Sequence, residues 1–137
     1  MNKVVPFDEE YFFDSDVIIS QTDLKGIITY ANRAFSKTSG YSQEELIGKA
    51  HNIIRHPDMP KAAFAKMWET ISGGQAWNGL LKNLRKDGKY YWVDTEILPI
   101  EDEDGTVTGY IAARKEASRK NIGETQETYS KMLDTEE

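Results

Sequence analysis

Three glycine-containing turns constrain the fold of this chain more than any other feature of its sequence. Asp23-Leu24-Lys25-Gly26, Asp87-Gly88 and Asp104-Gly105 each separate two short β-rich runs. Aspartate and glycine at such positions are typical of hairpins, because glycine adopts the positive φ that a tight turn often needs. The sequence therefore predicts antiparallel strand pairs near both ends of the chain.

The predicted strands form two groups with helices between them. We expect strands at residues 17–22, 27–31, 76–84, 89–99 and 106–115. Strands segregated from helices in this way are typical of an α+β fold. Because the first hairpin must join the last three strands, the pattern predicts one five-stranded antiparallel sheet with short helices packed on one face.

The middle of the chain carries start and stop signals for short helices. Asn32 is a candidate N-cap, Gly40 a stop, and Ser42 with Glu45 has the spacing of a capping box. A longer helix is expected to begin near Pro60, because four apolar residues then recur at helical spacing. These residues are Phe64, Met67, Trp68 and Ile71.

The composition is that of one domain with tails. The 137 residues, 39% of them hydrophobic, can bury one core. We expect an N-terminal extension at 1–15, the domain at 16–115, and a linker helix or tail at 116–137. Apolar runs fall short of the roughly 20 residues that a membrane span needs, and no leader-like stretch precedes the first acidic residues. We therefore expect the protein to be cytoplasmic and not to insert into the membrane directly. Association with a membrane-bound receptor is compatible with this expectation.

Charge and cysteine content exclude several kinds of function. The chain has no cysteine, which excludes disulfides, thiolate nucleophiles and cysteine-ligated zinc. The net charge of −6 argues against nucleic-acid binding, which depends on Lys and Arg. No nucleophile elbow or glycine-rich phosphate loop occurs, so the chain is not expected to be an enzyme.

One face of the third predicted strand is a candidate ligand wall. Trp77, Gly79, Leu81 and Asn83 alternate along it and therefore point to the same side of the sheet. An indole, a position without a side chain and an amide suit a flat heterocycle with polar edges. An ordinary core face with one satisfied asparagine is the alternative interpretation.

The segment 51–60 gathers both histidines of the chain with Arg55 and Asp58. His51 and His56 lie five residues apart across a proline, which is not the spacing of a helical zinc site, so no metal is expected. Structural roles remain open: Asp58 as a cap for the next helix, and Arg55 paired with an acid.

The whole pattern resembles the PAS sensory domains. The resemblance rests on the segments 22–32, Ser39-Gly40-Tyr41, 45–48, 85–88 and Tyr91-Trp92, and it spans about residues 16–115. Residues 52–64 and Trp77-Asn78-Gly79 look like the PAS domain of bacterial aerotaxis and energy-taxis receptors. This resemblance implies a non-covalently bound FAD whose redox state is read by a chemoreceptor signalling protein or domain of the HAMP or methyl-accepting type; it also allows a homodimer.

The resemblance also implies which residues bind or support the flavin. They are Asn32, His51, Arg55, His56, Asp58, Trp77 and Asn83. Trp77 is expected to pack on or beside the ring and Asn83 to meet its polar rim. Arg55, with His51 or His56, is expected to offset the pyrophosphate charge. Asp58 is expected to cap the following helix.

Arg114 lies near where light-oxygen-voltage relatives place a glutamine beside the flavin, so its charge is expected to favour a reduced, anionic ring. The light-driven thiol adduct of those relatives is excluded, because the chain has no cysteine.

Two other functions compete with the flavin redox sensor. A haem-binding gas sensor would use His51 or His56 as an axial ligand. A cofactor-free interaction or small-ligand module would use the same residues as ordinary core. For the flavin redox sensor, the resemblance implies that the outer face of the sheet contacts a partner, because PAS sheets often present this face. The candidate contacts are Tyr90, Trp92 and Leu98.

Overall fold

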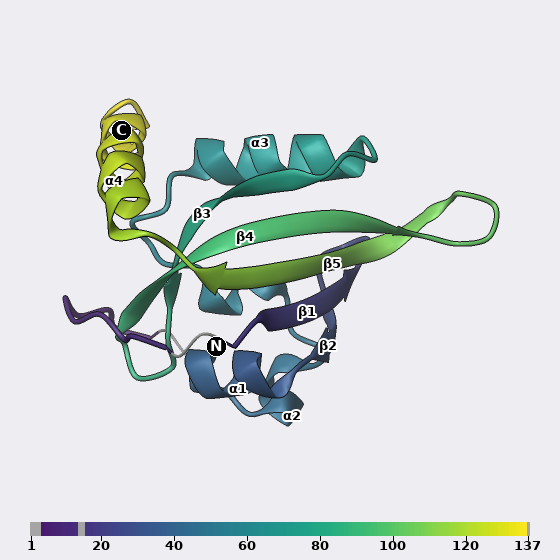
Figure 1. The fold of residues 1–137 in the computed structure, drawn as a ribbon, viewed down its shortest axis with the longest axis horizontal. Coiled ribbons are helices and arrows are strands. Elements are labelled where there is room, and N and C mark those ends of the chain that lie inside the picture. The colour runs from purple at the N-terminus through teal and green to yellow at the C-terminus, as the bar shows by residue number, and fades with distance from the viewer. Residues whose placement is uncertain (1–3, 14–15, 137) are drawn as a thin grey trace.

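A five-stranded antiparallel sheet forms the centre of the computed structural model, which describes residues 4–13 and 16–136. Its strands lie in the order β2-β1-β5-β4-β3 (Figure 1). Their bounds are β1 Ile18–Asp23, β2 Ile28–Ala31, β3 Trp77–Leu84, β4 Tyr90–Glu101 and β5 Val107–Glu116. The N-terminal hairpin joins the C-terminal strands through β1 and β5, which confirms the predicted single sheet.

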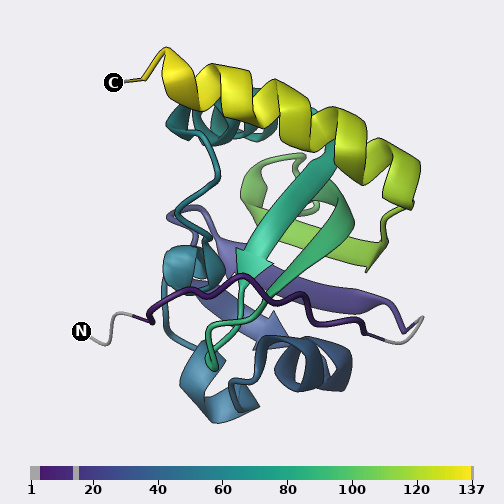
Figure 2. The same cartoon turned by 90° about the vertical axis from the view of Figure 1, so that its left-hand side faces the viewer.

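Helices cover both faces of this sheet, which differs in one respect from the prediction. The inner face carries α1 Arg33–Ser39, α2 Gln43–Leu46, the 3₁₀ helix η1 His51–Ile54 and α3 Lys61–Ser72. The C-terminal helix α4, Arg119–Asp134, packs on the outer face of β3 and β4. Figure 2 shows α4 lying across one side of the molecule. The predicted α+β class and PAS fold are confirmed, with a helix added on the second face.

The predicted caps form as hydrogen bonds. The Oδ1 atom of Asn32 accepts from the Phe35 amide at 3.0 Å, and Gly40 ends α1 with a φ of 81°. Ser42 and Glu45 form the complete capping box at the start of α2. These local interactions fix the short helices independently of their small apolar content.

The inner core has two apolar clusters at opposite ends of the sheet. The first is centred on Ile18, Phe35, Tyr91 and Val93, all of which are fully buried. The second joins α3 to β4 and β5 through Met67, Ile71, Ile97, Tyr110 and Ala112. Side chains of both clusters border the candidate site described below.

The outer face is buried where α4 crosses it. Trp92 is 5% exposed, because it packs beneath α4 against Ile122 and stacks on Tyr129 with ring centroids 6.4 Å apart. The Tyr129 hydroxyl donates to the Leu80 carbonyl at 2.6 Å. The prediction that Trp92 is free for a partner is therefore wrong: a helix of the same chain covers it. Leu98, on the same face, remains 41% exposed.

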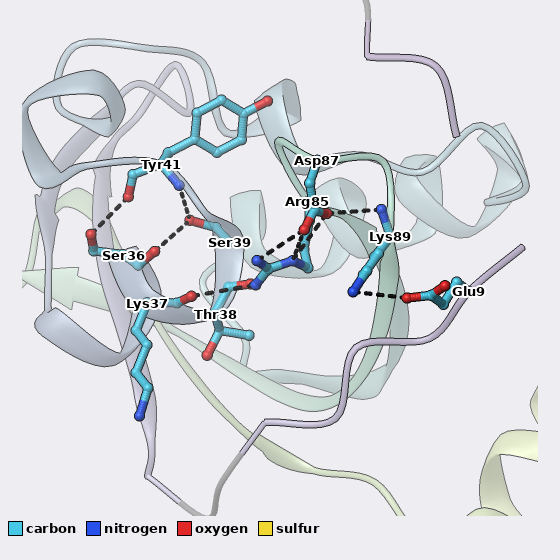
Figure 3. A network of polar contacts seen from close by, with 9 residues as sticks. All are labelled: Glu9, Ser36, Lys37, Thr38, Ser39, Tyr41, Arg85, Asp87 and Lys89. Atoms are coloured by element: carbon cyan, nitrogen blue, oxygen red, sulfur yellow. Dashed lines mark hydrogen bonds and ion pairs between the residues drawn. The ribbon is translucent and has the colours of Figure 1, made fainter. Parts of the chain in front are cut away.

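The N-terminal segment is attached to the turn between β3 and β4. The Tyr11 amide donates to the Tyr90 carbonyl at 2.7 Å, and the Phe13 ring packs edge-on against Tyr91. Arg85 stacks on the Tyr11 ring at 3.7 Å and donates to the Thr38 carbonyl at the end of α1. Figure 3 shows Arg85 with the Thr38 carbonyl, together with the ion pairs Arg85–Asp87 and Lys89–Glu9. The residues outside the predicted domain thus contact it directly; its boundaries at 16 and 115 stay a prediction.

Within residues 4–13 and 16–136, no helix has the length and apolar character needed to cross a membrane.

Candidate functional site

A cavity of about 400 Å³ lies between the inner face of the sheet and the segment formed by η1 and α3. Strands β1, β3, β4 and β5 supply one wall, and η1, Arg55 and α3 supply the other. Its apolar lining includes Ile54, Phe64, Met67, Ile71, Leu81 and Ile97. Its polar lining includes Ser20, His51, Arg55, Asn83, Thr95 and Arg114. An apolar cavity with a few convergent polar groups is the usual form of a small-molecule site.

Arg114 is a buried cation at the sheet wall of this cavity. Its side chain is held by Nη2, which lies 3.0 Å from Ser20 Oγ and 2.7 Å from His51 Nε2. Its Nε and Nη1 atoms are buried and make no hydrogen bond within the described part of the chain. No carboxylate among the described residues pairs with it. A guanidinium that is 3% exposed and lacks an anion is costly, because burial removes its hydration without replacement.

Two further polar atoms in the cavity wall are unsatisfied. The Nδ2 atom of Asn83 and the Oγ1 atom of Thr95 are buried and find no hydrogen-bond partner among the residues that the structure describes. Thr95 pairs with Arg114 across β4 and β5, so these two side chains lie side by side. Burial raises the pKa of the nearby Tyr91 phenol to about 12, and Arg114 and Asn83 oppose this rise only in part. Each unmade bond at a buried polar atom costs about 1–3 kcal/mol, so the wall is preorganised for hydrogen bonds to a ligand.

His51 is neutral in this setting. Burial, reinforced by the neighbouring Arg114 guanidinium, lowers the pKa of His51 to about 3. Because Nε2 faces the donor Nη2 of Arg114, it acts as an acceptor and the ring proton lies on Nδ1. The ring also stacks on Phe35 with centroids 5.6 Å apart. His51 therefore orients Arg114 without adding a second charge.

The depressed pKa of His51 should make the fold less stable in mild acid. An unfolded histidine binds a proton near pH 6.5, whereas folded His51 does so only near pH 3. The unfolded state therefore holds more protons between these values, and the free energy of unfolding should fall as the pH drops below 6.5, by about 1 kcal/mol per unit. Urea unfolding at several values between pH 6 and pH 5 measures this slope.

The control is His51→Gln, which keeps an acceptor for Arg114 but does not titrate. His56 contributes in the same direction, because burial lowers its pKa, so part of the slope should remain in this variant. Carboxylates with lowered pKa values, such as Glu45, contribute mainly below about pH 5 and do so equally in the wild type and in His51→Gln. Equal slopes for the wild type and His51→Gln would contradict the assigned protonation state.

Arg55 occupies the opposite wall of the cavity. Its guanidinium lies 4.3 Å from the centre of the Phe64 ring, and its backbone forms a β-bridge with Asn83. The structure thus brings together His51, Arg55 and Asn83, three of the predicted site residues, and adds Arg114.

The other four predicted residues lie outside the cavity lining. Asn32 caps α1 and its Nδ2 donates to the Val17 carbonyl at 2.9 Å. His56 is 4% exposed and accepts from the Asp58 amide through Nδ1 at 3.0 Å. The Trp77 indole lies over Gly79, where an added Cβ would be 2.5 Å from the ring. Their proposed relation to a ligand stays a prediction.

The expectation that Asp58 caps the following helix is wrong. The N-cap of α3 is Pro60, which makes no side-chain bond, and the Asp58 carboxylate instead pairs with Lys82 at 3.0 Å. The first amides of α3, those of Lys61 and Ala62, donate to the two carboxylate oxygens of Glu136 at 3.1 and 3.0 Å. A residue 75 positions away in sequence thus performs the capping.

Ser20 and Thr95 are two of the polar wall residues that sequence reasoning missed; Thr22, Lys25 and Asn52 also line the cavity. Ser20 and Thr95 both point to the inner face of the sheet. The preceding inward residue on the same strand is apolar in each case: Ile18 for Ser20 and Val93 for Thr95. A small hydroxyl at an inward position in a predicted strand could have signalled a polar spot on that wall.

Comparison with known proteins identifies the family. The profile described as the PAS fold matches residues 28–114. The aerotaxis receptor of Escherichia coli (strain K12) is 44% identical over 119 residues, 87% of this chain and 23% of that protein. The nitrogen fixation regulatory protein of Klebsiella pneumoniae is 35% identical over 76% of this chain and 21% of its own length. The light-state structure of the blue-light photoreceptor Aureochrome1 LOV shares the fold, with a TM-score of 0.72 at 23% identity over 79% of this chain and 90% of that one.

The chain belongs to the PAS family and is a PAS sensory domain of the kind found in signalling proteins. It spans less than a quarter of the length of the receptor and of the regulatory protein.

Proposed function

We propose that this domain binds a flavin nucleotide, FAD, non-covalently in the cavity and acts as a redox or oxygen sensor for a chemotaxis receptor or a similar transducer. The observation that carries the proposal is the buried Arg114 with two free guanidinium nitrogens in the cavity wall. The free atoms of Asn83 and Thr95 add to it. Together they are a donor-rich edge inside an apolar slot, which suits the carbonyl-bearing rim of an isoalloxazine ring.

A bound flavin would supply reversible electron uptake. The residues of the chain would determine how the ring is held and which side chains contact the negative charge that reduction adds to it. Arg114 would stabilise negative charge on the ring edge, because its own charge is not neutralised by a carboxylate of the described residues. Asn83 and Thr95 would bind the polar rim, and Arg55 would offset the phosphate charge. Asn32, His56, Asp58 and Trp77 would support the walls through the contacts described above.

The haem alternative is less compatible with the positions of the histidines. The Nε2 atom of His51 is engaged by Arg114 and Ser20, and an adjacent cation disfavours coordination of a ferric iron. His56 lies outside the cavity lining and uses Nδ1 to accept from a backbone amide.

The absorption spectrum of the purified chain tests the proposal. We expect the two bands of oxidised flavin, which disappear on reduction with dithionite and return in air. If the chain is purified without its ligand, added FAD should restore the bands and stabilise the fold, by about 2.7 kcal/mol at one hundred times the dissociation constant. Leu98→Ala, on the far face of the sheet, is the control that should bind normally. A Soret band would favour haem, and a folded, colourless chain that takes up neither flavin nor haem would favour the cofactor-free module.

A further inference from the structure

The carboxylate of Glu136 sits in a concentration of positive charge at the first turn of α3. Its two oxygens accept from the amides of Lys61 and Ala62, so that it binds the positive end of a 12-residue helix. These two hydrogen bonds are the main cause of a lowered pKa of Glu136, and the charges of Lys61 and Arg55 lower it further. The carboxylate thus occupies the position that an external anion would be expected to take.

This location borders the candidate cavity. Arg55 lines the cavity and is the residue to which we assign the phosphate charge of the ligand. Helix α3 supplies Phe64, Met67 and Ile71 to the lining, beginning one turn after the amides that Glu136 caps. A phosphate near Arg55 and the carboxylate of Glu136 would therefore lie within the same positive region and repel each other.

The helix that precedes Glu136 is held by few contacts. Ile122 is the one buried residue of α4, and Tyr129, Met132 and Leu133 are partly buried. A gap of about 230 Å³ remains between α4, β3 and the loop before α3, beside Tyr129 and Leu133. A modest repulsion at Glu136 can therefore shift the equilibrium between the attached and detached last turn of α4.

We propose that Glu136 is an autoinhibitory anion, which competes with the phosphate of the bound flavin nucleotide for the positive region at Arg55 and the first turn of α3. Phosphate binding weakens the attachment of the end of α4, and detachment of that end strengthens phosphate binding by the same factor, because the coupling is reciprocal. The inference rests on the proposed flavin-nucleotide function and adds a route from cavity occupancy to the C-terminal helix.

The test compares flavins with and without phosphate in the full chain. FAD, FMN and riboflavin carry the same ring, but riboflavin has no phosphate. In Glu136→Gln, the ratio of FAD affinity to riboflavin affinity should rise about threefold relative to the wild type, the range of an exposed charge interaction. A simple loss of the α3 cap would change both affinities together and leave the ratio unchanged. The control Glu124→Gln makes the same charge change on an exposed position of α4.

Hydrogen exchange provides a second readout on the wild type. FAD should accelerate amide exchange in the last turn of α4, and riboflavin should not. The change in the affinity ratio and the acceleration of exchange by FAD should both disappear at about 1 M salt, where charges are screened within about 3 Å.

An unchanged affinity ratio in Glu136→Gln, or an equal change in Glu124→Gln, would overturn the competition while leaving flavin binding intact. Failure of the wild type to bind any of the three flavins would instead overturn the proposed function, and the competition with it.

Discussion

Replacing Arg114 by methionine should stabilise the ligand-free domain and weaken its binding of FAD, two effects of opposite sign. The substitution removes a buried cation that has no carboxylate partner among residues 4–13 and 16–136, and it keeps an unbranched side chain. The free energy of unfolding should therefore rise by about 1–3 kcal/mol. The contact between Ser20 and His51 at 3.0 Å can remain. Loss of the charged donors should reduce FAD affinity about 30-fold. Urea unfolding and flavin titration measure the two effects.

The matched control is Lys115→Met, which makes the same charge change one residue further along β5, on the exposed outer face. It should alter neither quantity appreciably. Arg114→Lys should recover part of the affinity, because it restores the charge without the planar fork. A destabilised Arg114→Met variant with normal FAD binding would refute the assignment of Arg114 to the ligand.

Replacing Trp92 by alanine should release α4 from the sheet. The indole is nearly fully buried between β4 and the helix, and truncation of such a side chain costs about 3–5 kcal/mol. Much of that loss should fall on α4, which has little other apolar contact. We therefore expect its amides to lose hydrogen-exchange protection before those of β1 and β5.

Leu98→Ala tests the same face of the same strand outside the area covered by α4. Its side chain is 41% exposed, so the stability should change by less than about 0.5 kcal/mol. Equal losses in the two variants, or unchanged protection of α4 in Trp92→Ala, would show that Trp92 does not hold the helix.

Local signals made much of the fold predictable. The caps at Asn32 and Ser42 and the stop at Gly40 are interactions between residues at most five positions apart, which a sequence displays directly. The strand alternation likewise identified the inner face. The position of α4 could not be predicted in this way, because Trp92 and Tyr129 lie 37 positions apart and both are as typical of exposed partner surfaces as of packed interiors.

The candidate site was only partly predictable for the same reason. His51, Arg55 and Asn83 could be identified as candidates because their side chains are polar or ionisable. The resemblance to PAS domains then implied that they bind one ligand. The charge balance of the cavity was not visible, because it depends on which groups are absent around Arg114. Residues such as Asn32 and Trp77 have structural contacts that account for their chemical type without contact with the cavity.

The attachment of the N-terminal segment has a mechanical consequence. Tyr11 bonds to Tyr90 at the beginning of β4, and Glu10 in the same segment forms a two-bond ion pair with Arg119 at the start of α4. Tension applied to either flank of the domain therefore reaches the beginning of β4. This strand lies inside the sheet, between β3 and β5, and carries Thr95 in the cavity wall. Because the Glu10–Arg119 ion pair joins the N-terminal segment to the start of α4, a force on one flank is also transmitted to the other. The two flanks are therefore mechanically coupled.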